Sequence, residues 1–175
     1  MVIERLPIQN SYWVIPNRFR AGEHPSKGSA DGTKLKLRWL MEQGINYILD
    51  LTEIGEADVD YTTLITNIGS ILNMQVAYKR FAVQDWCTPS QQKMIEILDE
   101  IDLKLIEGKN LYLHCYGGKG RTGTVVGCYL VRHGTPVVSV LGKIQDLRKD
   151  IPGNYQISPE TDKQRKLVLE WNKGQ

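Results

Sequence analysis

The chain contains 175 residues, of which 41% are hydrophobic and 24% are charged, and this size and composition predict one soluble globular domain over residues 1–175. The formal net charge of +2 is too small to indicate nucleic acid or a membrane surface as a partner. The first ten residues lack the apolar core of a signal peptide, and no apolar run is long enough to span a bilayer. We therefore expect a cytoplasmic protein without a membrane anchor.

The cysteines and histidines limit the redox and metal chemistry that the chain is expected to support. Cys87, Cys115 and Cys128 form no CxxC pair, and an odd number without a secretory signal fits free thiols in a reducing compartment. The three histidines lie far apart in the sequence and show no metal-ligand spacing. We therefore expect neither a metal nor an organic cofactor. Cys128, in an apolar helical stretch, is expected to belong to the core.

The predicted elements alternate along the chain. Residues 17–32, which are rich in glycine, proline and charge, are predicted as a loop. In chain order there follow a helix over residues 35–43, a strand over 45–51, a helix over 61–73, a strand over 75–83, a helix over 89–107, a strand over 110–115, and helices over 121–133, 136–149 and 159–171. The predicted N-caps of the helices at 89, 136 and 159 are Thr88, Thr135 and Ser158.

Strands separated by helices predict a single α/β domain with a central, mostly parallel sheet flanked by helices on both faces. Ligands in such folds bind at the carboxyl ends of the strands. Cys115 is the last residue of the strand predicted over residues 110–115. This rule therefore indicates Cys115 as the first candidate for a functional residue.

The segment HCYGGKGRTG, residues 114–123, lies between a predicted strand and a predicted helix. Its glycines allow tight turns, and its backbone N–H groups, together with the N-terminus of the following helix, can form a site for a phosphate. The same surroundings favour a thiolate over a thiol. We therefore predict that Cys115 is a nucleophile inside a phosphate-binding loop formed by Tyr116, Gly117, Gly118, Lys119, Gly120 and Arg121.

Three side chains next to the nucleophile have predicted roles. The Arg121 guanidinium can hold two phosphate oxygens at once and stabilise charge in the transition state. The Thr122 hydroxyl can donate a hydrogen bond to the sulfur and make Cys115 a better leaving group. His114 is expected to organise the loop through hydrogen bonds and not to transfer protons.

This segment resembles the His-Cys-x5-Arg-Ser/Thr signature of the cysteine-dependent protein tyrosine phosphatase superfamily, and the chain is similar to its small dual-specificity branch of atypical and bacterial members. Residues 19–25 (FRAGEHP) resemble the early strand-and-turn segment of bacterial and atypical members of this branch, and residues 45–53 resemble their next strand. The resemblance implies hydrolysis of phosphomonoesters through a phosphocysteine intermediate by a protein tyrosine or dual-specificity phosphatase. The chain lacks the Lys-Asn-Arg-Tyr motif of tyrosine-specific members, which implies a shallow cleft and a broader substrate range.

Expelling an alkoxide or phenoxide requires a general acid, and the resemblance implies an aspartate about thirty residues before the cysteine. Asp85 lies at that distance, between a predicted strand and a predicted helix. Asp58 and Asp60 are weaker alternatives because no strand directly precedes them, and Asp50 is expected to be a structural hydrogen-bond acceptor. Trp86, beside the predicted acid, either lines the pocket or packs the loop.

Two further polar groups have weaker assignments. The segment around Gln164 loosely resembles a family segment with a water-positioning glutamine, but a solvent-exposed helix face is the favoured interpretation. Cys87 lies two residues from Asp85. It could approach Cys115 and form a protective disulfide, although a plain, partly buried thiol is favoured.

The predicted substrate class depends on Lys119. A lysine two residues before the arginine also occurs in phosphoinositide phosphatases and in enzymes that act on inositol pyrophosphates, and its ammonium group can reach a second phosphate. The lipid enzymes usually carry another lysine directly after the cysteine, where this chain has Tyr116. A phosphorylated protein or small phosphorylated substrate is expected, with phosphotyrosine-type activity favoured. The alternatives are an inositol phosphate or phosphoinositide phosphatase, an inactive phosphate-binding module and a rhodanese-like sulfurtransferase.

Overall fold

The computed structural model describes residues 7–57 and 59–175. The strands are β1 (Ser11–Ile15), β2 (Phe19–Gly22), β3 (Tyr47–Asp50), β4 (Ala77–Arg80) and β5 (Leu111–His114). The helices are α1 (Ala30–Glu42), α2 (Thr62–Ile71), α3 (Gln91–Ile106), α4 (Arg121–Arg132), α5 (Val137–Leu147) and α6 (Asp162–Leu169). Among the described residues, no helix is long and apolar enough to cross a membrane.

The five strands form one sheet in the order β1-β2-β5-β3-β4. β5 lies in the middle and pairs in parallel with β2 on one side and β3 on the other, and β4 continues the parallel sheet beyond β3. β1 pairs antiparallel with β2 at one edge. The prediction of an α/β domain with a central, mostly parallel sheet is confirmed. The carboxyl ends of the four parallel strands therefore meet at one edge, where ligands bind in such folds.

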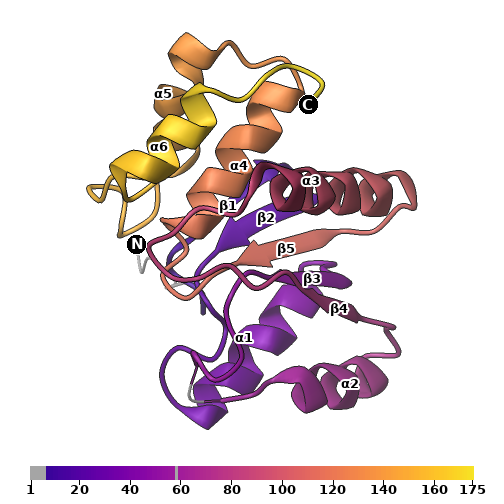
Figure 1. The fold of residues 1–175 in the computed structure, drawn as a ribbon. Helices are drawn as coiled ribbons and strands as arrows, with labels where there is room; N and C mark the ends of the chain where they lie inside the picture. Colours follow the sequence, from indigo (N-terminus) through magenta and orange to yellow (C-terminus); the bar gives the residue numbers. More distant parts are fainter. Residues whose placement is uncertain (1–6, 58) are drawn as a thin grey trace.

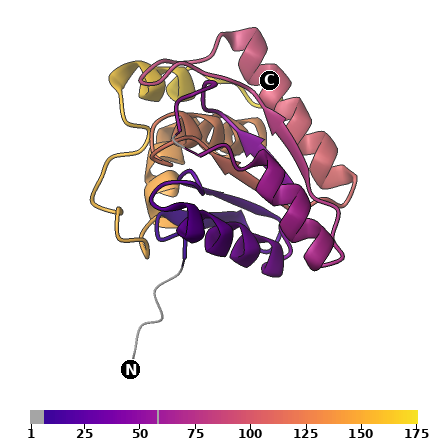
Figure 2. The same cartoon turned by 90° about the horizontal axis from the view of Figure 1, so that it is seen from below.

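Helices cover both faces of the sheet (Figure 1). On one face, α4 contacts α3, α5 and α6. On the other face, α1 and α2 contact each other, and Figure 2 shows the molecule from their side. Side chains alternate between the two faces along a strand. Leu111 and Leu113 of β5 accordingly belong to the core beneath α3 and α4, while Tyr112 belongs to the core beneath α1 and α2.

The predicted loop over residues 17–32 is wrong at both ends. β2 lies within it, and α1 begins at Ala30, well before the predicted start at residue 35. Ser29 is the N-cap of α1, and its side chain accepts a hydrogen bond from the Gly32 N–H. The large apolar residues of this helix begin only at Leu35, so a prediction from hydrophobic periodicity places the start too late.

β1 and β2 form an edge hairpin that the hydrophobic pattern does not predict. β2 reads FRAG, so a charged residue interrupts the apolar run that is typical of a buried strand. Arg20 is buried because its guanidinium stacks on the rings of Trp13 and Trp39, at 4.9 and 4.7 Å, and donates to the Ser11 hydroxyl. These partners come from β1 and α1, so only the tertiary structure explains the strand.

The predicted N-caps of three helices are also wrong: Thr88, Thr135 and Ser158. The observed N-caps of α3, α5 and α6 are Ser90, Pro136 and Thr161. Thr161 forms a capping box with Gln164, because each side chain bonds the backbone N–H of the other. The Ser158 hydroxyl instead donates to the Lys119 carbonyl at 2.7 Å, which joins the segment before α6 to the loop after β5. The other predicted elements are present with somewhat shorter bounds.

Candidate active site

Cys115 directly follows β5, the central strand, and so lies at the carboxyl edge of the sheet. The residue is 3% exposed, and its sulfur accepts a hydrogen bond from the Gly118 N–H at 3.3 Å. The chain turns around the sulfur through residues 115–120 and enters α4 at Arg121. The thiol therefore lies at the base of a loop that leads into a helix N-terminus, an arrangement that suits an anion.

This loop packs tightly against the end of β2. The His24 N–H donates to the Tyr116 carbonyl at 3.0 Å. Gly118 has a φ of +72°, and a Cβ added there would lie 2.4 Å from the Gly22 carbonyl carbon and 2.5 Å from the Glu23 nitrogen. A side chain at this position would combine left-handed backbone strain with a clash against fixed backbone atoms, so only glycine fits.

We expect Gly118→Ala to lower the rate of aryl phosphate hydrolysis by about 100-fold or more, because a displaced loop misplaces the reacting groups. Gly108→Ala is the matched control, since Gly108 has a φ of +80° but no atom within 4 Å of an added Cβ. Both variants carry backbone strain of about 1–2 kcal/mol, so both should lose some thermal stability. Equal activity of the two variants would contradict the importance of the close packing.

The Arg121 side chain is 1% exposed and meets groups from two other loops. Its Nη1 donates to Glu56 Oε2 at 2.7 Å and to the Val83 carbonyl at 2.9 Å, while its Nη2 also bonds Glu56 and lies 2.9 Å from Asp85 Oδ1. Burial works to lower the pKa of Arg121, but the hydrogen bonds to Glu56 and the nearby charges of Cys115, Glu56 and Asp85 together raise that pKa above its ordinary value. The guanidinium is thus a fixed positive charge near Cys115.

Glu56 is a site residue that the sequence does not distinguish. It lies between β3 and α2 and forms a bidentate pair with Arg121. Asp58 and Asp60, close to Glu56 in the sequence, are acidic as well, so the sequence does not single out Glu56. Asp60 bonds the backbone N–H and the hydroxyl of Thr62 at the start of α2 and does not line the pocket that holds the nucleophile. Asp58 lies outside the described residues.

The candidate active site is a pocket of about 210 Å³ at the carboxyl edge of the sheet. Its lining residues are Asp85, Trp86, Cys115, Tyr116, Gly117, Lys119, Gly120, Arg121 and Glu160. The fold therefore brings the predicted nucleophile, the predicted acid and most of the predicted phosphate loop to one place. Trp86, which is 61% exposed, is a pocket residue. Glu160, from the segment between α5 and α6, is an addition that the sequence does not indicate.

His114 and Thr122 lie inside the protein on either side of the loop. His114 is fully buried, its Nε2 pairs with the Tyr61 hydroxyl, and its Nδ1 lies 3.3 Å from the Cys115 carbonyl. Burial lowers the pKa of His114, so the ring is neutral and suited to organising the loop. The Thr122 hydroxyl is buried without a hydrogen-bond partner among residues 7–57 and 59–175. Its hydrogen bond to the sulfur stays a prediction.

Two histidines that are distant in the sequence meet beneath this loop. Atoms of His24, Asp50 and His114 lie within 4.8 Å of one another, although the two histidines are 90 positions apart in the sequence, and the expectation that the chain holds no metal stays a prediction. Burial and the neighbouring His114 lower the pKa of His24 to about 3. His24 Nδ1 meets the N–H and hydroxyl of Ser26. The carboxylate of Asp50 accepts hydrogen bonds from Thr52, Tyr78 and Arg80. These contacts define a hydrogen-bond network that supports the loop.

The prediction that Gln164 lies on a solvent-exposed helix face is wrong, because the residue is 1% exposed. Its Nε2 donates to the Cys87 carbonyl at 3.2 Å, and its Oε1 accepts from the N–H groups of Glu160 and Thr161 at 3.1 Å each. Gln164 thereby joins the loop that carries Asp85 to the segment that carries Glu160. The sequence does contain one signal for the position of this side chain, the capping box. A threonine three residues before a glutamine at a helix start predicts that the glutamine side chain turns back to the backbone of the threonine.

The other two cysteines are free thiols, as is Cys115. Cys128 is fully buried in the core, and burial raises its pKa well above the ordinary value. Cys87 is partly buried in the loop between β4 and α3. The disulfide between Cys87 and Cys115 stays a prediction.

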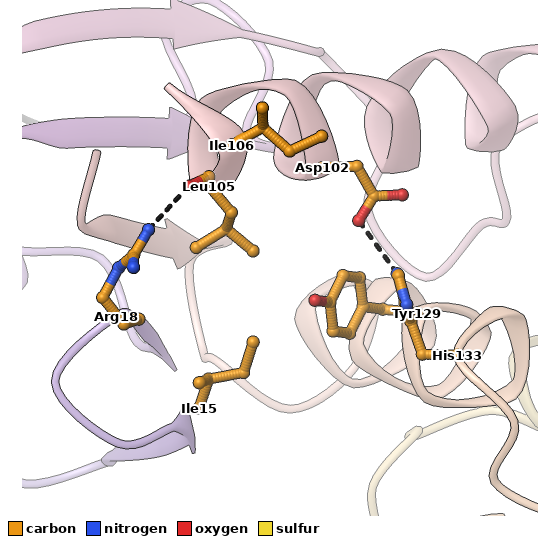
Figure 3. Close-up of a pocket in the computed structure, with 7 residues that line it drawn as sticks. All are labelled: Ile15, Arg18, Asp102, Leu105, Ile106, Tyr129 and His133. Carbon is orange, nitrogen blue, oxygen red and sulfur yellow. Dashed lines mark hydrogen bonds and ion pairs between the residues drawn. The ribbon is translucent and has the colours of Figure 1, made fainter. Parts of the chain in front are cut away.

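A larger pocket, of about 530 Å³, lies at the opposite edge of the sheet (Figure 3). Arg18, in the turn between β1 and β2, borders it at the amino ends of β2 and β5. Several of its polar groups are already paired, because Arg18 Nη2 donates to the Leu105 carbonyl at 2.6 Å and Asp102 lies 2.8 Å from His133, although Arg18 Nε has no hydrogen-bond partner among the described residues. This pocket offers no nucleophile beside an anion site, so the smaller pocket at Cys115 is the better candidate.

The protein family Tc-R-P, described as "Polymorphic toxin system, DSP-PTPase phosphatase", matches residues 22–135 of the chain. This stretch is more than half of the 175 residues and contains Asp85, Cys115 and Arg121. The chain therefore belongs to this family, and the predicted relationship to the cysteine-dependent protein tyrosine phosphatase superfamily is confirmed. The segment with Glu160 and Gln164 lies beyond the matched residues.

Individual proteins share shorter or more distant likenesses. "Phosphatidylglycerophosphate phosphatase PTPMT1" of Arabidopsis thaliana is 40% identical over 53 residues, which are 30% of this chain and 16% of that protein. "Protein tyrosine phosphatase domain-containing protein 1" of Mus musculus is 27% identical over 127 residues, 69% of this chain and 17% of that protein. The chain thus spans only a small part of each relative. The crystal structure of Tk-PTP in its active form matches 92% of this chain and 95% of that chain, with a TM-score of 0.72 at 22% identity. This likeness shows a shared fold.

Proposed function

We propose that this chain hydrolyses phosphomonoesters through a phosphocysteine intermediate. The observation that carries the proposal is the convergence of Cys115, Arg121 and Asp85 on one small pocket at the end of the central strand. A sulfur nucleophile, a bidentate cation and a carboxyl group are the parts that a two-step phosphoryl transfer requires. An inactive phosphate-binding module has no need of all three, and a rhodanese-like sulfurtransferase has no need of Asp85.

The chemistry proceeds in two steps. In the first, the Cys115 thiolate attacks phosphorus, the bond from phosphorus to the ester oxygen breaks, and Asp85 gives its proton to the departing oxygen. Arg121 holds two phosphate oxygens and stabilises their charge. In the second, water attacks phosphorus, Asp85 takes the proton of the water, and the sulfur leaves as a thiolate with Thr122 as its hydrogen-bond donor. The products are an alcohol or phenol and inorganic phosphate.

Glu56 prepares Arg121 for this role. Its carboxylate and the Val83 carbonyl hold the guanidinium, so little reorientation is needed when a phosphate arrives. Arg121 Nη2, which also bonds Glu56, lies 2.9 Å from Asp85 Oδ1. When a phosphate oxygen accepts the hydrogen bond of this nitrogen in place of Asp85, the Asp85 side chain is free to turn toward the leaving group.

The walls of the pocket favour a phosphorylated protein, with phosphotyrosine as the preferred residue. Trp86 and Tyr116 line the pocket and are 61% and 36% exposed. Aromatic faces at a pocket opening suit an aryl group, which packs against them in stacked or edge-to-face geometry. The cleft has no second aromatic layer among its lining residues, so phosphoserine and phosphothreonine are also compatible with it.

A lipid or inositol monophosphate is the second candidate substrate. Lys119 lines the same pocket, and the Arabidopsis thaliana relative is named a phosphatidylglycerophosphate phosphatase. The test ranks kcat/KM for phosphotyrosine and phosphoserine peptides, soluble inositol phosphates, and vesicles that contain phosphoinositides or phosphatidylglycerophosphate. A phosphotyrosine peptide at the top supports the first candidate, and a lipid at the top supports the second. A folded protein that is inactive on the whole panel would contradict the proposed function.

Asp85→Asn should slow substrates with poor leaving groups, such as alkyl phosphates, by about 10²–10⁴-fold and 4-nitrophenyl phosphate much less, because only a basic leaving group needs the proton. The decline of kcat/KM at high pH should also flatten, since the group that loses the proton is gone. Asp60→Asn, a matched change outside the pocket, should alter neither measurement. Equal losses for all leaving groups with an unchanged pH profile would remove Asp85 from the role of acid.

A further inference from the structure

Lys119 and Glu160 form an ion pair inside the candidate active site. Lys119 Nζ lies 2.6 Å from Glu160 Oε1, and the two side chains are 28% and 22% exposed. Both residues line the pocket that holds Cys115. The lysine of the phosphate loop is therefore already paired with a carboxylate that comes from a distant part of the chain.

The segment that carries Glu160 is held in place by hydrogen bonds that do not involve the Glu160 side chain. The Ser158 hydroxyl donates to the Lys119 carbonyl at 2.7 Å, and the Glu160 N–H donates to Gln164 Oε1 at 3.1 Å. On the other side, Arg165 Nη1 donates to the Glu160 carbonyl at 3.0 Å. The position of Glu160 is thus set independently of its pairing with the lysine.

One glycine of the phosphate loop and one in the first turn of α4 make room for this segment. A Cβ added at Gly120 would lie 3.1 Å from Glu160 Oε2, and one added at Gly123 would lie 2.1 Å from Ser158 Oγ. Neither glycine has a positive φ, so close approach and not backbone freedom explains them. The chain is therefore built so that a carboxylate can reach the phosphate loop.

Both cations that line the pocket are already paired with carboxylates before any phosphate binds. Arg121 faces Glu56 and Asp85, and Lys119 faces Glu160. One phosphate group can still be held by Arg121 and the loop N–H groups. A second phosphate on the same molecule would need Lys119 as its cation and would instead meet the carboxylate of Glu160. Such like-charge contacts are strongly unfavourable at a binding site.

We propose that Glu160 restricts this site to substrates with a single phosphate group, by holding Lys119 and repelling a second phosphate. The inference rests on the proposed function and names a specificity-determining residue of the same site. It reverses the interpretation that Lys119 binds a second phosphate of a polyphosphorylated inositol, because the lysine is already paired with Glu160. A phosphotyrosine side chain, which carries one phosphate, meets no such barrier.

The test compares orthophosphate and pyrophosphate as competitive inhibitors of 4-nitrophenyl phosphate hydrolysis. The two anions differ by one phosphate group and need no proton for a leaving group, so the ratio of their Ki values reports recognition alone. Glu160→Gln keeps the shape of the side chain and removes its charge. We expect it to raise the preference for pyrophosphate about tenfold or more, as a new charge-assisted hydrogen bond from Lys119 would. Adding Lys119→Met to this variant should abolish the gain.

Glu170→Gln is the matched control, because Glu170 follows α6, is exposed and pairs only loosely with Lys166, at 3.7 Å. It removes one negative charge away from the pocket and should leave the Ki ratio unchanged. An unchanged ratio in Glu160→Gln, or a gain that persists without Lys119, would overturn the inference. So would a selective loss of alkyl phosphate turnover at a constant ratio, which would make Glu160 a proton donor.

Failure of the proposed function is distinguishable from failure of this inference. A folded protein that does not hydrolyse 4-nitrophenyl phosphate lacks the proposed activity. The affinities for orthophosphate and pyrophosphate are then measured by calorimetry on the same three variants. A ratio of the two affinities that shifts toward pyrophosphate in Glu160→Gln supports the role of Glu160 in excluding a second phosphate. A constant ratio overturns that role.

Discussion

Cys115→Ser will bind phosphate but will hydrolyse 4-nitrophenyl phosphate about 10⁴-fold more slowly or worse, because it lacks the attacking group of the covalent step. Serine keeps the size of the side chain, whereas its hydroxyl is not ionised near neutral pH. Rapid quenching with radiolabelled substrate should trap a phosphoenzyme on the unaltered protein and none on the variant. Calorimetric titration with phosphate checks that the loop is intact.

The other cysteines provide controls for this result. Cys128 is fully buried in the core, so Cys128→Ser should lower the melting temperature and leave the kcat of the folded protein unchanged. Cys87→Ser, in the loop before α3, should retain turnover and also form the trapped phosphoenzyme. A Cys115→Ser protein with activity close to that of these controls would exclude a phosphocysteine mechanism.

Arg121→Lys should lower kcat/KM for 4-nitrophenyl phosphate by about 10³-fold, although the charge is conserved. Lysine is a point charge that cannot hold two phosphate oxygens in one plane. It also cannot bond both oxygens of Glu56 and the Val83 carbonyl together, as the guanidinium does. Steady-state kinetics measure the first effect, and a lower melting temperature in scanning calorimetry reports the second.

Arg20→Lys is the matched change at a second buried arginine. Arg20 is 4% exposed and stacks on Trp13 and Trp39, away from the lining of the catalytic pocket. This variant should lose thermal stability and keep its kcat/KM. If Arg121→Lys behaved in the same way, with a lower melting temperature and normal kinetics, Arg121 would be a structural residue only.

Local sequence accounts for most of the fold. β3 and β5 are short apolar runs between helix signals, so their existence and parallel pairing follow from the pattern. β2 does not follow from it, because Arg20 is stable in a buried strand only when tryptophans from β1 and α1 enclose it. The N-cap of α6 is also not predictable from local sequence. Ser158 resembles an N-cap in the sequence, but its hydroxyl donates to the Lys119 carbonyl, 39 residues away.

The candidate site likewise contains residues that local sequence indicates and residues that only the tertiary structure reveals. Cys115, Arg121 and Asp85 carry local signals, namely a glycine-rich loop between a strand and a helix, and a carboxylate that follows another strand. Glu56 carries no such signal, because its role exists only through contact with a residue 65 positions later. Gln164 reaches across 77 positions to the Cys87 carbonyl. Contacts of this length are set by the packing of whole elements, which hydrophobic periodicity does not describe.

The central place of β5 has a consequence for how the site behaves in time. β5 is paired on both sides and buried on both faces, whereas β1 and β4 are edge strands. Such a strand separates only when the whole domain unfolds, while connecting loops open at much lower free energy. Cys115 is therefore attached to a strand that resists local opening, whereas Asp85 lies in the connection between β4 and α3. A local opening of that connection would displace the predicted acid and leave the predicted nucleophile in place.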